Sequence, residues 1–127
     1  MEIRNHTADD YPIFCHWWGQ WGWPSIPYEF LPKNSLVVCH DDRPICAVFL
    51  YATDSPIVWA EYYISSKSDP LRDEAMNVML KGILPASQAM GAKAVMSGVR
   101  HPHLAKRLRA VGFVKSDENL TSYILAV

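Results

Sequence analysis

The feature that most constrains the fold is a series of three strand-like segments in the middle of the chain, joined by short turns. Residues 35–40 and 45–51 are rich in β-branched, aromatic and other apolar residues, a composition typical of strands. Between them, Asp41-Asp-Arg-Pro44 has the turn chemistry of a hairpin. A third segment, residues 57–65, follows the turn signal Asp54-Ser-Pro56. The sequence therefore predicts a central antiparallel meander.

The part of the chain before this meander predicts a strand, a helix and an irregular connection. Residues 2–7 favour a short strand. Thr7 followed by Asp9 and Asp10 is an N-cap signal for a helix that continues to about Trp18. Three prolines and two glycines between residues 19 and 32 then predict an irregular, partly helical connection with an apolar surface.

The part of the chain after the meander alternates helix and strand. Asp69 and Pro70 mark the start of a long helix whose apolar residues recur at helical spacing up to Gly91. Pro85 within it predicts a kink or a break. The remaining elements are a strand over 93–99, a short helix over 103–110 and a last strand over 120–127. The predicted order is β-α-loop-β-β-β-α-β-α-β, in one domain of residues 1–127.

The composition limits the class of protein. A chain of 127 residues has the size of one domain that buries its own core. Its 12 basic and 13 acidic residues give no overall field that would attract nucleic acid or an anionic membrane. No apolar run approaches the ~20 residues of a membrane span, and the first residues do not resemble a signal peptide. We therefore expect a soluble, cytoplasmic protein without a membrane or nucleic-acid partner.

The cysteines and histidines do not predict a metal site. Cys15, Cys39 and Cys46 cannot all pair with one another, and they lie in apolar segments. No combination of cysteine and histidine, including His101-x-His103, has the usual spacing of zinc ligands. We expect reduced, packed thiols and no metal.

Two local patterns, together with the element order, carry a resemblance to a known family. Leu104-Ala-Lys-Arg-Leu-Arg-Ala-Val-Gly112-Phe113, followed by a predicted strand, resembles the short helix, Gly-Phe pair and strand that end GCN5-related N-acetyltransferase (GNAT) domains. Trp59-Ala-Glu61-Tyr-Tyr-Ile64 resembles the family's fourth strand, in which an acidic residue precedes a valine-like position by three. The whole chain resembles a small, divergent GNAT protein of bacterial or phage type. The resemblance implies an α/β fold with a central, mostly antiparallel mixed sheet and helices on both faces.

The resemblance also implies a function. It points to an N-acyltransferase that uses acetyl-CoA, or another acyl-CoA, and an amine acceptor. Carried over to this sequence, it implies Glu61 as a base acting through water, the backbone of Ile64 as a partner of the pantetheine arm, Arg72 as a phosphate ligand and His101 as a further coenzyme contact. A strand of period two places Glu61 on the same face as Trp59 and Tyr63. There Glu61 is either a desolvated base or an exposed strand residue.

The sequence departs from the family pattern in two places. The family's phosphate loop, Q/R-x-x-G-x-G/A, corresponds here to residues 67–75, KSDPLRDEA, in which both glycines are missing. Pro70 lacks an N–H, and three carboxylates lie where a phosphate would sit. The tyrosine that often precedes the Gly-Phe glycine by four positions is Leu108 here. These departures favour an alternative, a GNAT-like fold that has lost coenzyme chemistry and binds a macromolecular partner.

The segment 100–109, RHPHLAKRLR, is basic. It is either a solvated helix face or a surface that faces phosphates. In the resembled fold it lies close to the phosphate end of the coenzyme.

The stretch HWWGQWGWP, residues 16–24, holds four of the five tryptophans. Large aromatic side chains stabilise a glycine-interrupted loop as a small core of their own. In the resembled fold, however, this connection borders the acceptor groove, so the expected substrate-binding residues, or the contact surface of a binding module, are Trp17, Trp18, Trp21 and Trp23. We expect two of them to pack and two to be presented. The sequence leaves the acceptor and the oligomeric state open, including a homodimer through the last strand or the tryptophan segment.

Overall fold

The computed structural model describes all 127 residues, and its centre is a five-stranded mixed sheet in the order β1-β2-β3-β4-β5. Four strands pair antiparallel, and the fifth pairs parallel to β4. The strands are β1 (Glu2–Arg4), β2 (Asn34–His40), β3 (Arg43–Ala52), β4 (Ile57–Ser65) and β5 (Ala94–Met96). The predicted meander and the mostly antiparallel mixed sheet are confirmed.

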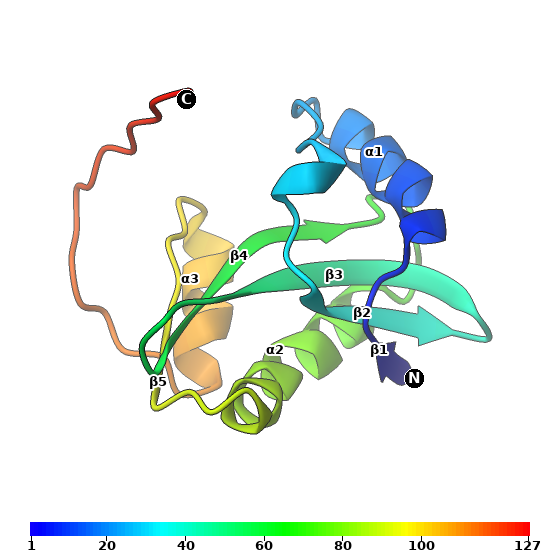
Figure 1. Ribbon diagram of the computed structural model, residues 1–127. Coiled ribbons are helices and arrows are strands. Elements are labelled where there is room, and N and C mark those ends of the chain that lie inside the picture. Colours follow the sequence, from blue (N-terminus) through cyan, green and yellow to red (C-terminus); the bar gives the residue numbers. More distant parts are fainter.

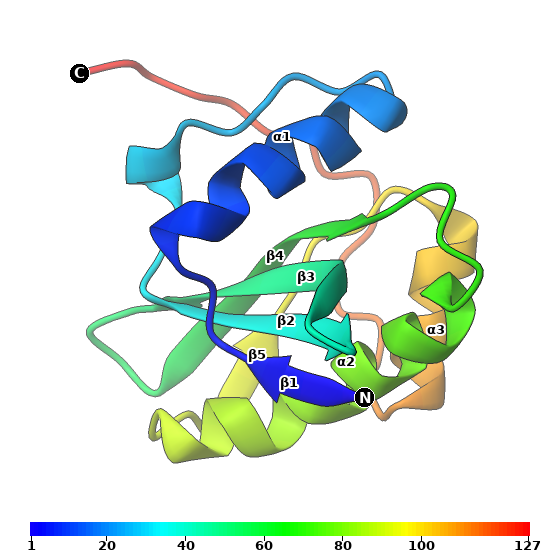
Figure 2. The ribbon, with the colours of Figure 1, turned by 90° about the vertical axis from the view of Figure 1, so that its right-hand side faces the viewer.

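Three α-helices cover the two faces of this sheet (Figure 1, Figure 2). Helix α1 (Tyr11–Gln20) lies on one face, while α2 (Arg72–Ala89) and α3 (Pro102–Ala110) lie on the other. Two 3-10 turns, Ala8–Asp10 and Tyr28–Phe30, precede α1 and interrupt the loop after it. None of the helices is both long and apolar enough to cross a membrane.

The hairpin between β2 and β3 closes through Asp41 and Asp42. Both residues have a positive φ, 49° and 62°, as the two central positions of a type I′ turn require. His40 and Arg43 form the last residue pair before the turn. Asp tolerates this left-handed backbone better than most residues, so the local sequence fixes the hairpin.

Two hydrophobic clusters lie on opposite faces of the sheet. Under α1, the buried side chains of Phe14, Trp17 and Trp18 pack against Val37 and Phe49 of the sheet. Under α2 and α3 lies a larger cluster. Its members include Val48, Leu50, Met79, Ile83 and Leu108. Both faces of the central strands are therefore buried, which explains their nearly continuous apolar sequence.

The predicted last strand is absent. Residues 114–127 form no ladder with the sheet, and the chain after α3 extends away from the body (Figure 1, Figure 2). The composition of residues 120–127 favours a strand, but a strand also needs a neighbour to hydrogen-bond. The single chain leaves this segment without one.

Of the kink or break predicted at Pro85, the break is absent. Helix α2 is continuous from Arg72 to Ala89. Pro85 and Lys81, whose carbonyl loses its usual donor, are both on the exposed side of the helix. Water can bind that carbonyl there, so the helix tolerates the proline.

Candidate functional site

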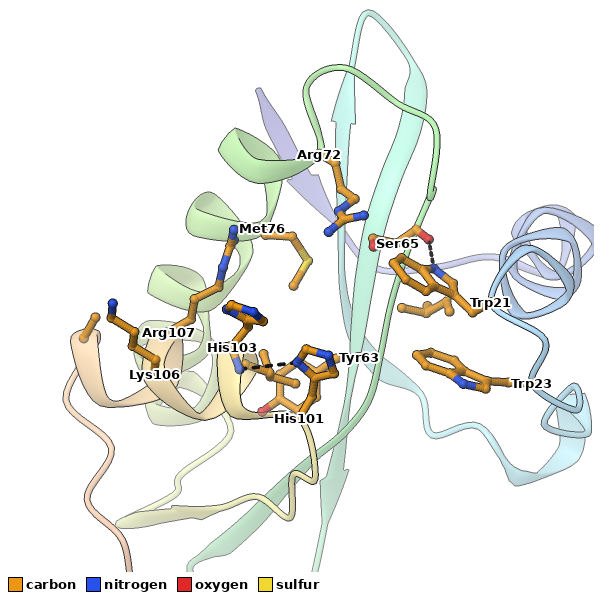
Figure 3. Close-up of a pocket in the computed structure, with 13 residues that line it drawn as sticks. Trp21, Trp23, Tyr63, Ser65, Arg72, Met76, His101, His103, Lys106 and Arg107 are labelled. Carbon is orange, nitrogen blue, oxygen red and sulfur yellow. Dashed lines mark hydrogen bonds between the residues drawn. The ribbon is translucent and has the colours of Figure 1, made fainter.

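Strands β4 and β5 separate after three residue pairs, and a cavity lies where they part. The parallel ladder runs from Ile57 to Trp59 of β4 and stops there. Beyond it, a cavity of about 820 Å³ is lined by Tyr63, Ile64 and Ser65 of the same strand. Its other walls come from α2, from α3 and from the segment after α1 (Figure 3). Four parts of the chain, β4, α2, α3 and the segment after α1, thus form one site.

A bulge in β4 decides which side chains face this cavity. Between the residue pairs that involve Ile64 and Glu61, β4 supplies Tyr62 and Tyr63 opposite the single Val48 of β3. Tyr62 has a φ of 58°, and such an extra residue reverses the alternation of the strand. Tyr63 therefore packs with the cluster beneath α2. The expectation that Glu61 and Tyr63 share a face is wrong, because that expectation assumed a regular strand.

Where β4 and β5 separate, hydrogen bonds that involve side chains connect β4 to the residues after β5. The Ser97 hydroxyl donates to the carbonyl of Ala60 at 2.7 Å. A hydroxyl has one proton to donate, so the phenol of Tyr63, 2.6 Å from Ser97 Oγ, is the donor in that second contact. Glu61 Oε1 accepts a hydrogen bond from the N–H of Gly98 at 3.0 Å. These bonds hold β4 and the chain after β5 at a fixed separation.

Burial shifts the pKa of Glu61 and that of Tyr63 on this strand. Desolvation raises the pKa of Tyr63 to about 12, against the opposing effect of its bond to Ser97. Desolvation also raises the pKa of the half-buried Glu61, and the N–H of Gly98 opposes this shift. Tyr63 is consequently protonated at neutral pH, and Glu61 is a stronger base than a fully solvated glutamate.

The four clustered tryptophans divide into two pairs. Trp17 and Trp18 are each only 3% exposed and belong to the cluster under α1. Their burial corrects the expectation that they contact a substrate, because no ligand reaches a side chain packed between a helix and a sheet. Trp21 and Trp23 line the cavity, with stacked rings whose centroids are 5.6 Å apart. The indole N–H of Trp21 donates to the carbonyl of Ser65 at 2.9 Å, which fixes this wall to β4.

Cationic side chains lie on two sides of the cavity. The guanidinium of Arg72 and the ammonium of Lys67 lie over the ring of Trp21, at 5.1 and 5.3 Å from its centroid. Across the cavity, α3 contributes Lys106 and Arg107 (Figure 3). Cation–π contacts of this kind hold flexible side chains over an aromatic face. The result is a positively charged rim around an aromatic wall.

One guanidinium nitrogen of Arg107 has no hydrogen-bond acceptor within the protein. Its Nη2 donates to Asp73 Oδ1 at 2.9 Å, whereas its Nη1 is buried without a partner. A buried donor without an acceptor is costly. The Arg107 side chain is 31% exposed and lines the cavity, so its guanidinium is accessible to an anionic ligand there.

The loop before α2 differs from a glycine-rich phosphate loop, but its charge is partly neutralised within the protein. Asp69 accepts hydrogen bonds from Arg43 Nε at 2.8 Å and from the N–H of Leu71 at 2.9 Å. The Arg43 guanidinium keeps the pKa of Asp69 low. The backbone N–H groups of Asp73 and Glu74, in the first turn of α2, have no partner within the chain. Two donors at a helix N-terminus thus remain free for an anion.

A second, smaller cavity adjoins this helix end. It measures about 270 Å³ and is lined only by polar residues and a proline, namely Lys67, Asp69, Pro70, Arg72 and Asp73. Arg72 lines both cavities. The aromatic cavity therefore has a polar extension toward the start of α2.

The start of α3 carries two adjacent imidazoles. Nδ1 of His101 accepts from the N–H of His103 at 3.3 Å, so His101 acts as the N-cap of α3. The two rings stack with centroids 5.3 Å apart, and both line the cavity. Leu108, at the position of the family's tyrosine, is buried in the cluster beneath α2. No hydroxyl from that position faces the cavity.

The cysteines lie away from this site. Burial raises the pKa of Cys39 and that of Cys46, the latter to about 12. All three cysteines are free, and no group of three or more His, Cys, Asp or Glu side chains is arranged to hold a metal ion. Cys39 and Cys46 are protonated packing groups.

Comparison with known proteins identifies the fold. No family model matches the sequence, and no curated protein sequence is significantly similar to it. Solved structures, in contrast, align with nearly the whole chain. A wild-type protein from Thermus thermophilus covers 100% of this chain and 99% of its own at a TM-score of 0.74 and 17% identity. A Trypanosoma brucei acetyltransferase covers 97% and 99% at a TM-score of 0.69 and 12% identity.

A third similar structure is the aminoglycoside N-acetyltransferase AAC(6')-Iy, in complex with the bisubstrate analogue CoA-S-monomethyl-acetylneamine. It covers 98% of this chain and 98% of its own, with a TM-score of 0.67 and 17% identity. The chain thus has the GNAT fold, as the sequence resemblance implied.

Proposed function

We propose that this protein is an N-acyltransferase that binds an acyl-CoA in the cavity between β4 and α3 and transfers the acyl group to an amine. The observation that carries the proposal is the cavity where β4 leaves β5, which combines an aromatic wall with a cationic rim. An acyl-CoA has the matching two-part character, an uncharged pantetheine arm and a polyphosphate end. The CoA complexes of the similar AAC(6')-Iy structures support a coenzyme of this type.

The cations around the cavity suit the phosphates. Lys67, Arg72 and Asp73 line the polar extension, the N–H groups of Asp73 and Glu74 are free in the first turn of α2, and Arg107 lines the larger cavity. In this proposal these groups replace the missing glycine loop, and Arg72 and His101 keep their expected places beside the coenzyme. Ile64 lies in the stretch of β4 that has no partner on the side of β5, next to which the pantetheine arm would run.

Glu61 is the proposed base. In acyl transfer the acceptor nitrogen forms a bond to the thioester carbonyl carbon, the carbon–sulfur bond breaks, the nitrogen loses a proton and the departing thiolate gains one. The pKa of Glu61 is raised by burial, which suits a carboxylate that takes the nitrogen's proton through a water molecule. Leu108 has no proton to give the departing thiolate. His101 or His103, which line the cavity, would donate a proton to it.

Aromatic side chains beside Glu61 and at the edge of the cavity also suggest what kind of amine is accepted. Tyr62 is substantially exposed and packs edge-on against Tyr51, with ring centroids 6.1 Å apart. Trp23 is half exposed at the edge of the cavity. Aromatic faces of this kind attract cationic and planar groups, so the proposed acceptor is an amine carried on such a group.

Calorimetric titration with acetyl-CoA and with free CoA tests the proposal. We expect micromolar binding and a higher melting temperature in the presence of ligand. Arg107→Ala should weaken binding of both ligands about tenfold or more, since one hydrogen bond to a charged group contributes ~1.5–3 kcal/mol. Arg109→Ala is the matched control, because Arg109 is exposed on the same helix and does not line the cavity. We expect it to change binding less than twofold.

Glu61→Gln separates chemistry from binding. It should lower turnover with an amine acceptor about 100-fold, a typical contribution of a general base, while acetyl-CoA binds as in the wild type. Absence of binding at millimolar acetyl-CoA would refute the enzyme proposal. The GNAT-fold binding module, with Trp21 and Trp23 as its contact residues, would then be the remaining interpretation.

A further inference from the structure

The hydrogen bonds between β4 and β5 follow a pattern that predicts where the next bond should form. The N–H of Ala94 donates to the carbonyl of Pro56 at 3.2 Å. In a parallel ladder such bonds are evenly spaced and recur on every second residue of each strand. Two such steps further along both chains, the pattern assigns the N–H of Gly98 to the carbonyl of Ala60. That bond is absent.

Two side chains occupy the place of the missing bond. The Ser97 hydroxyl, from the chain after β5, donates to the Ala60 carbonyl at 2.7 Å. The carboxylate of Glu61, from β4, accepts from the Gly98 N–H at 3.0 Å. One bond between two backbones is thus replaced by two bonds that each run through a side chain. The replacement keeps the backbones apart and gives Glu61 a backbone donor.

The phenol of Tyr63 fixes the direction of the Ser97 hydroxyl. Ser97 has a single proton to donate, and the Ala60 carbonyl accepts it. Tyr63 donates to Ser97 Oγ at 2.6 Å. Burial raises the pKa of Tyr63 to about 12, so Tyr63 remains a donor over the whole pH range in which a carboxyl group titrates. The Ser97 proton is therefore held on Ala60.

We propose that Ser97 is a positioning residue for Glu61: by donating to the Ala60 carbonyl, Ser97 leaves the Gly98 N–H available to the Glu61 carboxylate. This inference rests on the proposed function, in which Glu61 is the base. Ala60 is fully buried, and a buried carbonyl needs a donor. Without the Ser97 hydroxyl, the ladder pattern supplies the Gly98 N–H to that carbonyl, and Glu61 loses its hydrogen bond.

No other group of the protein substitutes for this donor. Glu61 forms no ion pair, and the bond from Gly98 is the one hydrogen bond to its side chain. The titratable groups that face Glu61 are the phenols of Tyr51 on β3 and Tyr63 on β4, and burial is the main cause that raises the pKa of each to about 12. Both are uncharged where Glu61 titrates. The Gly98 N–H is therefore the group that stabilises the carboxylate.

An NMR titration of the ligand-free, full-length protein tests the proposal. The side-chain carboxyl carbon of Glu61 reports its ionisation, and the amide proton of Gly98 reports the bond between the two residues. In the wild type both signals should titrate together. In Ser97→Ala the pKa of Glu61 should shift upward, because the carboxylate loses a donor that favours its charged form. The Gly98 amide proton should then follow the ionisation of Glu61 with a much smaller amplitude.

Two further variants separate positioning from a general loss of structure. Ser97→Thr keeps the hydroxyl and should restore the wild-type pKa of Glu61. Ser87→Ala is the matched control, because Ser87 Oγ is buried and has no hydrogen-bond partner; it should leave the titration of Glu61 unchanged. An unchanged pKa of Glu61 in Ser97→Ala would overturn the proposal. So would a failure of Ser97→Thr to restore it, or a wild-type Gly98 amide proton that does not respond to Glu61.

This titration needs no coenzyme and no acceptor. It therefore separates a failure of the positioning proposal from a failure of the enzyme proposal, which acetyl-CoA binding tests. With an amine substrate, the acid limb of kcat/KM should move to higher pH in Ser97→Ala and stay in place in Ser97→Thr, because the base must be ionised. A lower kcat/KM with an unmoved acid limb would contradict the proposal, since it would give Ser97 a structural role only.

Discussion

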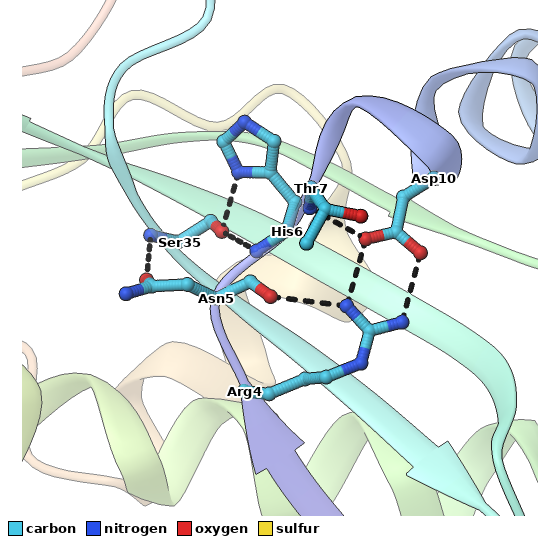
Figure 4. A network of polar contacts seen from close by, with 6 residues as sticks. All are labelled: Arg4, Asn5, His6, Thr7, Asp10 and Ser35. Carbon is cyan, nitrogen blue, oxygen red and sulfur yellow. Dashed lines mark hydrogen bonds and ion pairs between the residues drawn. The ribbon is translucent and has the colours of Figure 1, made fainter.

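Asp10 is a nearly fully buried carboxylate that ties the N-terminal strand to the start of α1 (Figure 4). Its two oxygens accept from Arg4 Nη1 at 2.7 Å and Nη2 at 2.8 Å, and Oδ2 also accepts from the N–H of Thr7 at 2.8 Å. Next to it, the N–H of His6 donates to Ser35 Oγ at 2.8 Å, which anchors the same segment to β2. We predict that Asp10→Asn destabilises the protein substantially without changing its fold.

The magnitude follows from what the substitution removes. Asparagine keeps an oxygen for Thr7 but loses the charge, and its NH₂ group opposes the guanidinium of Arg4. Removing one partner of a fully buried ion pair costs ~3–5 kcal/mol, whereas a single hydrogen bond to a charged group contributes ~1.5–3 kcal/mol. The Arg4 side chain is 40% exposed, so water can solvate the freed guanidinium and the lower range applies. We expect a loss of about 2–3 kcal/mol in the free energy of unfolding, or roughly 6–12 °C in Tm.

Urea and thermal unfolding at pH 7 measure this effect. Asp73→Asn is the control, because Asp73 also pairs with an arginine, at 2.9 Å, but is 78% exposed. Exposed pairs contribute about 0–1 kcal/mol, so the control should lose less than 1 kcal/mol. A loss below about 0.5 kcal/mol for Asp10→Asn, or equal losses for the two variants, would refute the reasoning from burial.

The pH dependence of Asp10→Asn provides a second measurement. The Arg4 guanidinium holds the pKa of Asp10 below its ordinary value of 3.8. A lowered folded-state pKa contributes stability that is fully present above the unfolded-state value and is lost as the pH falls through the folded-state value. The difference in stability between wild type and variant should therefore shrink as the pH falls below about 4.

Three further predictions concern the core, the thiols and the proposed base. Phe14 is fully buried between α1 and the sheet, so Phe14→Ala should cost ~3–5 kcal/mol in urea unfolding; a smaller loss than Asp10→Asn would contradict the packing described here. In the native protein a thiol reagent should modify Cys15 first, because Cys39 and Cys46 are buried and have raised pKa values; all three should react in urea. If an amine substrate is found, kcat/KM should fall with decreasing pH through an apparent pKa above 4.5, because burial raises the pKa of Glu61 and the base must be ionised; Glu61→Gln should abolish that acid limb.

Much of the fold was readable from the sequence because its signals are local. The turn at Asp41 and Asp42, the apolar strands on either side and the helical spacing after Pro70 depend only on residues close together in the chain. Each predicted element of this kind is present with small shifts at its ends, such as β3, which begins at Arg43 and not at residue 45. The break predicted at Pro85 is the exception among these local signals. Whether a proline interrupts a helix depends on whether the carbonyl that it leaves free, here that of Lys81, is exposed to water.

The candidate site was only partly predictable because its geometry depends on contacts between distant elements. The sequence pointed to Glu61, Ile64, Arg72 and His101, and the structure places the last three on one cavity. Glu61 lies at the point where β4 and β5 separate, bonded to Gly98. Tyr63 was named only as a neighbour of Glu61 on a regular strand. The basic composition of residues 100–109 was the only signal for Lys106 and Arg107, and it does not reveal which cation faces inward.

The sequence by itself determined the helices, the strands, the turns and the presence of a tryptophan-rich segment, because propensity and periodicity act over a few residues. Only the tertiary structure decided that Trp17 and Trp18 are core while Trp21 and Trp23 line a cavity, since burial depends on what packs against a side chain. The bulge at Tyr62 was also decided only by the tertiary structure, because a bulge is defined by the register with another strand. Residues 120–127 show the limit most clearly, because their sequence has strand propensity but a strand forms only where another strand pairs with it.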